Sequence, residues 1–302
     1  MLLDRLGLWP ARAVWLVAPL LIGTALGQVL ESEASTPALI VEVSLWLGWF
    51  AVLVATLAPS PRSLTLIRVL GPAAFGALVL VGLAGHWNPT TLLGLGWAAL
   101  FTAVVFLPTV GDRMINGSAY GSERRMALRP PAFVLLGPAQ VAWLASFAGL
   151  VGWAVLVLAN QFILAALAAA VGAVAIWASI RVLHQLARRW VVFVPAGFVI
   201  HDPLLLVDAV LLRRNEVSTL GPALDPLASG RAETGDGYRD LSAGALGLAL
   251  EVVLRDKTPV TIRENGQARN VELDEMVFTP TLPGAMLREA RIRGLKIAAA
   301  DG

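Results

Sequence analysis

The sequence predicts an α-helical membrane protein with six transmembrane helices and a small β-rich domain outside the membrane. Composition is the first observation behind this prediction: 57% of the 302 residues are apolar and only 15% are charged, against about 25% charged residues in a soluble domain. Distribution is the second, because long apolar blocks fill the chain before residue 188 and charges return after it. The third is the change, at the same point, to short alternating segments typical of strands. We therefore expect a membrane domain over 1–187 and a β domain over 188–302.

A transmembrane helix requires about 20 mainly apolar residues, and six segments meet that requirement. They are 13–30, 38–58, 66–85, 91–109, 133–158 and 160–182. Polar or turn-forming breaks separate them, and the longest break is the stretch 111–131. The third segment is the least regular, since Pro72 lies in its first turns and Arg68 near one end. The long side chain of Arg68 is expected to extend to the membrane surface.

Arginines alternate between the predicted connections. Those at the N-terminus and in every second connection are Arg5, Arg12, Arg62, Arg68, Arg113, Arg124, Arg125, Arg129, Arg181, Arg188 and Arg189. The intervening connections, at 31–37, 86–90 and around 159, hold none. Because basic residues stay on the cytoplasmic side, we expect a multi-pass protein of the bacterial inner membrane with both termini in the cytoplasm. A cleaved signal peptide is disfavoured, since no small-residue cleavage site precedes "ESEAS" and five more spans follow.

Several function classes are excluded by what the sequence lacks. The chain has no cysteine, so disulfides, thiolate metal sites and cysteine nucleophiles are ruled out. P-loop, GxGxxG, HExxH and EF-hand motifs are absent, and the basic residues are not interleaved with aromatic ones as in nucleic-acid-binding proteins. Apart from Glu42 the spans are nearly free of acids, unlike the broken, polar spans of coupled transporters. We expect no catalytic residue, metal, cofactor or nucleic-acid partner.

Small residues in the first span predict close helix packing. The segment "GTALG" places Gly23 and Gly27 on one helix face. That spacing lets two helix backbones approach each other. The contact is expected either inside the bundle or between the subunits of a homo-oligomer.

The polar stretch 111–131, "GDRMINGSAYGSERRMALRPP", is the strongest candidate for a site. In one interpretation it is a topology anchor whose arginines contact anionic phospholipids. In a second it docks a partner protein or the β domain, since tyrosine and arginine are common interface anchors. In a third, Asp112, Glu123 and the arginines hold a phosphate or a divalent metal. The candidate residues are Arg113, Tyr120, Arg124, Arg125 and Arg129.

After residue 188 the pattern predicts about six or seven antiparallel strands and one C-terminal helix. "WVVFVPAGFVIHD" reads as two strands joined at Gly197, and "NGQ" as a second tight hairpin. The stretch 221–240 is rich in Gly, Pro and Asp and is expected to be a mobile loop. "TLPGAMLREARIRG" predicts a helix that Thr281 caps, Pro283 begins and Gly294 ends.

This order resembles the bacterial pleckstrin-homology-like domains, which are often attached to membrane helices. The likeness lies in "RRWVVFVPAGFVIHDPLLLVDAVLLRRNEV" and in "GLALEVVLRDKTPVTI" through "VFTPTLPGAMLREARIRGL". It implies a fold and protein binding. Phosphoinositide-binding members carry basic residues in the first turn, whereas Pro195-Ala196-Gly197 is uncharged. Arg213 and Arg214 are the nearest paired cations, and adjacent strand residues point to opposite faces.

These observations predict a non-enzymatic function. We expect a scaffold or accessory subunit that assembles or regulates a membrane complex serving the cell envelope or its lipids, with other membrane proteins as partners. The first alternative is a component of a lipid transporter or flippase. The second is a membrane enzyme acting on a phosphorylated lipid. A polar cavity reaching into the bilayer favours the transporter, convergence of Asp112 and Glu123 with the arginines favours the enzyme, and a loop packed on the β domain favours the scaffold.

Overall fold

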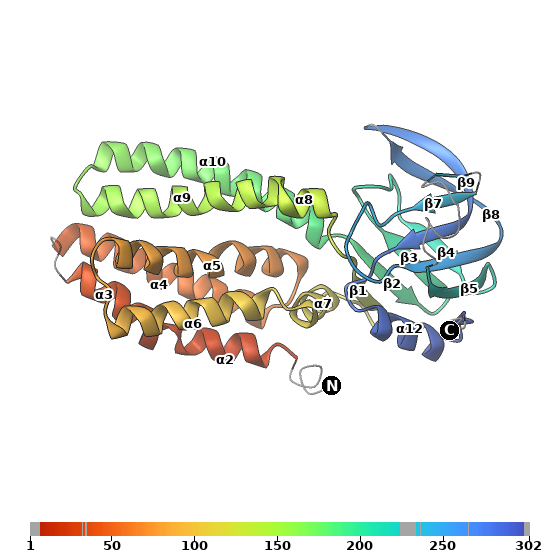
Figure 1. Ribbon diagram of the computed structural model, residues 1–302, viewed down its shortest axis with the longest axis horizontal. Coiled ribbons are helices and arrows are strands. Elements are labelled where there is room, and N and C mark those ends of the chain that lie inside the picture. Colours follow the sequence, from red (N-terminus) through yellow and green to blue (C-terminus); the bar gives the residue numbers. More distant parts are fainter. Residues whose placement is uncertain are drawn as a thin grey trace. The chain divides into compact units, whose positions relative to one another are not determined.

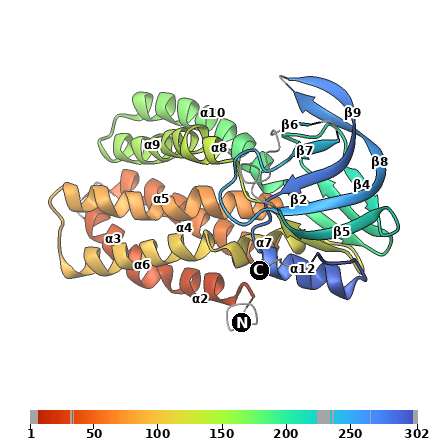
Figure 2. The same ribbon diagram turned by 45° about the vertical axis from the view of Figure 1, so that its right-hand side comes forward.

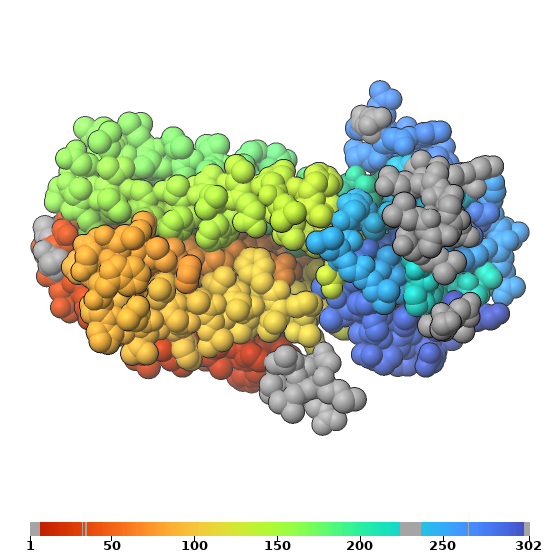
Figure 3. Space-filling view, viewed as in Figure 1, coloured from red at the N-terminus to blue at the C-terminus, as the bar shows by residue number. Residues whose placement is uncertain are grey.

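A computed structural model describes residues 7–31, 33, 35–223, 234–235, 237–264 and 266–298 (Figure 1). The chain forms two compact units (Figure 3). The helical unit contains Met1–Gly117 and Gly137–His184, and the sheet unit contains Ser118–Leu136 and Gln185–Gly302. A helical part with candidate membrane spans and a separate sheet region are therefore present, as expected. The sheet unit also takes in 118–136, which the sequence analysis had assigned to the membrane domain.

The helices lie over the predicted spans, except that the fourth predicted span, 91–109, is broken between Val105 and Pro108. They are α2 (Trp9–Ala18), the π-helical turn η1 (Pro19–Gly23), α3 (Thr24–Leu30), α4 (Ser35–Leu57), α5 (Pro61–Leu83), α6 (Pro89–Val105), α7 (Pro108–Asn116), α8 (Ala132–Leu136), α9 (Pro138–Leu158) and α10 (Phe162–Ala187). Within the described residues, five helical stretches are long and apolar enough to cross a membrane. A sixth is added if α6 and α7, bent by 58°, form one span. The fold is thus compatible with a multi-pass membrane protein.

The bend between α6 and α7 is caused by a proline, and an arginine from α5 binds to it. Pro108 begins α7, and a residue before proline is pushed out of the helical conformation; Leu107 has ψ 135°. Arg68 of α5 donates from Nε to the Val105 carbonyl at the break, at 3.3 Å. Its guanidinium lies 5.2 Å from the Phe106 ring centroid. Arg68 therefore binds a carbonyl freed by the bend, which the expectation of a surface-seeking side chain had missed.

The backbones of α9 and α10 approach each other closely in the helical unit. A Cβ built on Gly172 would lie 3.0 Å from the Gly149 Cα atom, and the Ser146 and Ser179 hydroxyls are 2.6 Å apart. By contrast, a Cβ on Gly27 would meet nothing within 4 Å, and one on Gly23 only Pro19. The predicted close packing at Gly23 and Gly27 is not found within the described chain, and a contact between subunits stays a prediction.

The sheet unit contains two sheets. The first has the antiparallel order β1 (Arg124–Ala127), β2 (Trp190–Val194), β3 (Gly197–His201) and β4 (Val210–Arg213). The second has the order β5 (Val217–Pro222), β8 (Leu250–Glu264), β9 (Gln267–Phe278), β7 (Tyr238–Asp240) and β6 (Thr234–Gly235), with β7 and β9 parallel. Both hairpins are present, since Val194 pairs with Gly197 and Glu264 with Gln267. Most of the predicted mobile loop, 224–233 and 236, lies outside the described residues.

The core of the sheet unit lies between the two sheets and α12 (Pro283–Ile292) (Figure 2). Phe193, Phe198 and Phe278 are fully buried in it, and Met286 joins them from the helix. As predicted, Pro283 is in the first turn of α12, and Gly294 follows its end with φ +76°. The predicted cap is wrong.

Thr281 does not cap α12, because it binds β1. Its hydroxyl and its backbone N–H both donate to the Ala127 carbonyl at 2.8 Å. The Arg129 N–H donates to the Thr279 carbonyl, also at 2.8 Å, and Leu128 pairs with Pro280. On its other edge β1 pairs with β2 along its whole length. The segment 124–129 therefore joins both sheets, and the connection from β1 to β2 is the helical hairpin formed by α8, α9 and α10.

Candidate functional site

The polar stretch 111–131 is divided between the two units. Asp112 and Arg113 lie in α7 of the helical unit, and Asp112 is buried. Tyr120, Glu123, Arg124, Arg125 and Arg129 lie in the sheet unit. The two acids and the arginines thus do not gather within a single unit.

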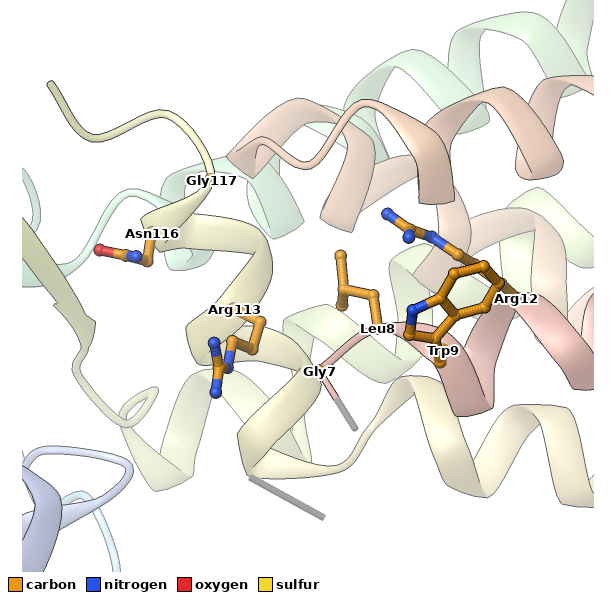
Figure 4. Close-up of a pocket in the computed structure, with 7 residues that line it drawn as sticks. All are labelled: Gly7, Leu8, Trp9, Arg12, Arg113, Asn116 and Gly117. Carbon is orange, nitrogen blue, oxygen red and sulfur yellow. The ribbon is translucent and has the colours of Figure 1, made fainter. Parts of the chain in front are cut away.

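Arg113 borders a pocket of about 370 Å³ in the helical unit (Figure 4). The lining residues are Gly7, Leu8, Trp9, Arg12, Arg113, Asn116 and Gly117. Arg12 donates from Nε and Nη2 to the Thr56 carbonyl near the end of α4, at 3.1 and 3.0 Å, where helix carbonyls lack partners. Its guanidinium lies 5.5 Å from the Trp9 ring centroid. Among the described residues, the lining contains two cations and no acid, so it suits an anionic group rather than a hydrolytic reaction.

Arg125 lies on the outer face of the first sheet, beside Trp190. Arg125 donates to the Ser118 hydroxyl at 2.9 Å, and its guanidinium lies 5.6 Å from the Trp190 ring centroid. Trp190 and His201 are paired across β2 and β3 with their ring centroids 4.9 Å apart. Residues paired across antiparallel strands share a face, so this face carries a cation and two aromatic rings.

The pKa of His201 is lowered below its ordinary value of 6.5, first by burial and next by the charge of Arg188. Arg125 adds to this effect and Asp202 opposes it. The imidazole of the folded protein therefore takes up a proton at lower pH than that of the unfolded chain.

The sheet unit is expected to lose stability as the pH falls through about 6.5, because the unfolded chain then binds a proton that folded His201 does not. Unfolding is measured by urea titration in mild detergent, with Val210→Cys as a buried thiol that becomes reactive on unfolding in an otherwise cysteine-free chain. Between about pH 7.5 and pH 5.5 the midpoint should fall in the wild type and fall less in His201→Gln. Equal falls in both proteins contradict the assignment.

A buried ion pair holds the end of this sheet. Arg189 donates from Nε and Nη2 to Asp202 Oδ2 at 2.9 and 2.7 Å. Its guanidinium also donates to the carbonyls of Arg129 and Leu241, at 2.6 and 3.2 Å. The side chains are 1% and 0% exposed. In the sequence Arg189 is one of the arginines that predict the orientation in the membrane, and no local pattern predicts its pairing with Asp202.

Tyr120 is the most exposed aromatic side chain among the described residues of the sheet unit, at 82%. The turn that carries it is fixed, because the Tyr120 N–H donates to Glu123 Oε2 at 3.3 Å. Arg293, just after α12, also donates to the Ser122 carbonyl at 2.6 Å. The ring is thus displayed from an ordered turn.

Arg213 and Arg214 lie beside the turn between β2 and β3. Arg213 pairs with Glu216 at 2.9 Å. Arg214 donates to the Pro195 carbonyl at 2.9 Å. The turn that is uncharged in the sequence therefore has a cation beside it, supplied by the connection between β4 and β5.

No group of three or more His, Asp or Glu side chains in the described part of the chain could hold a metal ion. Comparison with known proteins finds no matching family model, no matching curated protein and no matching solved structure. The function must therefore be argued from the geometry.

Proposed function

We propose that the protein is a non-enzymatic scaffold or accessory subunit of a membrane complex, and that Tyr120 and the surrounding turn are its docking surface. The observation that carries this proposal is the use of 124–129 as a strand of the sheet unit. The sheet unit is thereby linked to the membrane helices through three chain crossings, before β1, after β1 and before β2. Such attachment suits a domain that holds a partner at a fixed place on a membrane.

Location follows from the same proposal. The protein is placed in the bacterial inner membrane with both termini and the sheet unit in the cytoplasm, on the evidence of its arginine distribution. The asymmetry persists when Arg68 and Arg189, which bind inside the protein, are left out. A role in the cell envelope is part of the proposal.

The sheet unit is proposed to be a pleckstrin-homology-like domain. Two sheets and a C-terminal helix support this reading. The parallel pairing of β7 with β9 and the origin of β1 between two spans depart from that pattern. Of the properties of pleckstrin-homology-like domains, we propose only protein binding for the sheet unit.

A lipid transporter or flippase component is the second candidate. It is favoured by the bend between α6 and α7, because broken spans commonly line transport sites. An enzyme is the least supported, since the lining of the Arg12 and Arg113 pocket contains no acid.

The docking proposal is tested by photo-cross-linking in cells. A benzophenone amino acid at Tyr120 is expected to give one dominant protein adduct, and the same probe at exposed Ala268 of β9 should not. The partner should co-purify with the wild type and with Tyr120→Phe, and be lost from Tyr120→Ala, because the ring supplies the contact. Equal adducts at both positions, or retention in Tyr120→Ala, contradict the docking surface. Bound phospholipid without any protein partner favours the second candidate.

A further inference from the structure

The loop 242–248, "SAGALGL", between β7 and β8, exposes apolar side chains that a water-facing loop does not need. Leu246 is 72% exposed and Leu248 52%. No charged residue lies between Asp240 and Glu251. Exposed leucines at the tip of an otherwise small-residue loop are the composition of a segment that enters a lipid interface.

The conformation of this loop is fixed from its base. Ser242 donates from its N–H and its hydroxyl to the Asp240 carboxylate, at 2.6 and 2.9 Å. The Ala245 N–H donates to the Ser242 carbonyl at 3.1 Å. Ala243 has φ +51° and Gly247 φ +126°, and a positive φ is unusual for alanine. The backbone conformation of the loop thus keeps both leucine side chains exposed.

The loop lies against the segment that leads into a span. A Cβ on Gly247 would be 2.9 Å from the Arg129 guanidinium carbon. Arg129 precedes by three residues Ala132, the first residue of the candidate span Ala132–Leu158. The start of that span, within the sheet unit, also exposes Phe133 at 69% and Leu136 at 75%. The loop therefore contacts, through Gly247, the arginine that leads into a candidate membrane span.

Arg129 supplies the charge that an anionic lipid needs. Its Nε atom is buried without a hydrogen-bond partner, as is the Thr279 hydroxyl, on the residue whose carbonyl binds the Arg129 N–H. Arg129 as a whole is only partly buried, and a guanidinium whose other N–H groups can reach solvent is suited to a phosphate oxygen. If Ala132–Leu158 crosses the membrane, an arginine three residues before it is at the position expected for a contact with headgroup phosphates.

We propose that the loop 242–248 inserts into the bilayer interface near the start of that span, Ala132–Leu136, with Leu246 and Leu248 among the acyl chains and Arg129 on a phospholipid phosphate. This inference rests on the proposed membrane location. It is independent of the partner proposed at Tyr120.

Electron paramagnetic resonance tests the insertion, because the chain has no cysteine. Nitroxide labels are placed singly at Leu246→Cys, Leu136→Cys and Ala268→Cys, in nanodiscs of phosphatidylcholine and phosphatidylglycerol. At Leu246 and at Leu136, oxygen is expected to relax the label more than a water-soluble nickel complex does. At Ala268 the nickel complex is expected to relax the label more than oxygen does. Nickel-favoured relaxation at Leu246 with oxygen-favoured relaxation at Leu136 overturns the insertion. Nickel-favoured relaxation at both sites overturns the membrane location itself.

The role of Arg129 is tested with the same label. Arg129→Gln is expected to move the Leu246 label toward water, and Arg129→Lys to keep its depth. Equal depth in Arg129→Gln and the wild type overturns the phosphate contact.

Discussion

Residues 188–302 produced alone are expected not to fold, whereas the same residues preceded by 118–131 should form a stable soluble domain. In the second protein a Gly/Ser linker of about eight residues, with a root-mean-square span of roughly 15 Å, replaces the helical hairpin 132–187. Circular dichroism and a thermal melt compare the two. A cooperative transition is expected only when 118–131 is present.

The expectation rests on the two edges of β1. Without it, Met126 and Leu128, which are 2% and 4% exposed, are missing from the core, a loss of about 1.5–3 kcal/mol for each side chain. The Arg189 carbonyl also loses the N–H of Leu128, which donates to it at 3.0 Å. Since small domains are stable by only about 5–15 kcal/mol, this deficit is a large fraction of the total.

A matched control shows whether the added stability comes from β1 or only from the greater length of the chain. The linked protein carrying Met126→Asp and Leu128→Asp is expected to behave like 188–302 alone, because both side chains face the core. If 188–302 alone melts as cooperatively as the linked protein, β1 is dispensable and the assignment is wrong.

The sequence could predict the helices and most strands because their signals are local. Apolar runs of sufficient length identified the candidate spans, and the segments around Gly197 and Gly266 identified the hairpins. Local signals also predicted the limits of α12 at Pro283 and Gly294. These features depend on residues close together in the chain.

The parts that the sequence could not predict depend on distant partners. "RRMA" at 124–127 is too short and too polar to be recognised as a strand, and its partner β2 begins 63 residues after Ala127, beyond the three helices α8, α9 and α10. Thr281 is a good cap by composition, but the Ala127 carbonyl from another region takes its hydroxyl. The division of 111–131 between two units was hidden for the same reason, and so was the use of Arg189 inside the protein.

Asp202→Ala is expected to lower the free energy of unfolding of the sheet unit by about 3–5 kcal/mol, because it leaves the Arg189 charge buried without its partner. The mutation acts at a point where three segments meet. Arg189 binds β3 through Asp202, the end of the β1 segment through the Arg129 carbonyl, and the base of the 242–248 loop through the Leu241 carbonyl. The urea midpoint of the Val210→Cys reporter in detergent measures the loss.

The double variant Arg189→Met with Asp202→Ala shows whether the cost comes from the charge. Once the guanidinium is gone, Asp202→Ala should cost far less stability. The loss in free energy of unfolding of the double variant is therefore expected to be well below the sum of the two single losses. The double variant should still be less stable than the wild type, because the Arg129 and Leu241 carbonyls then lack a donor, at a cost of about 1–3 kcal/mol each. Additive losses would mean that the two side chains act independently. Coupled losses would mean that β1, β3 and the proposed lipid-inserting loop are held in register by one buried charge pair.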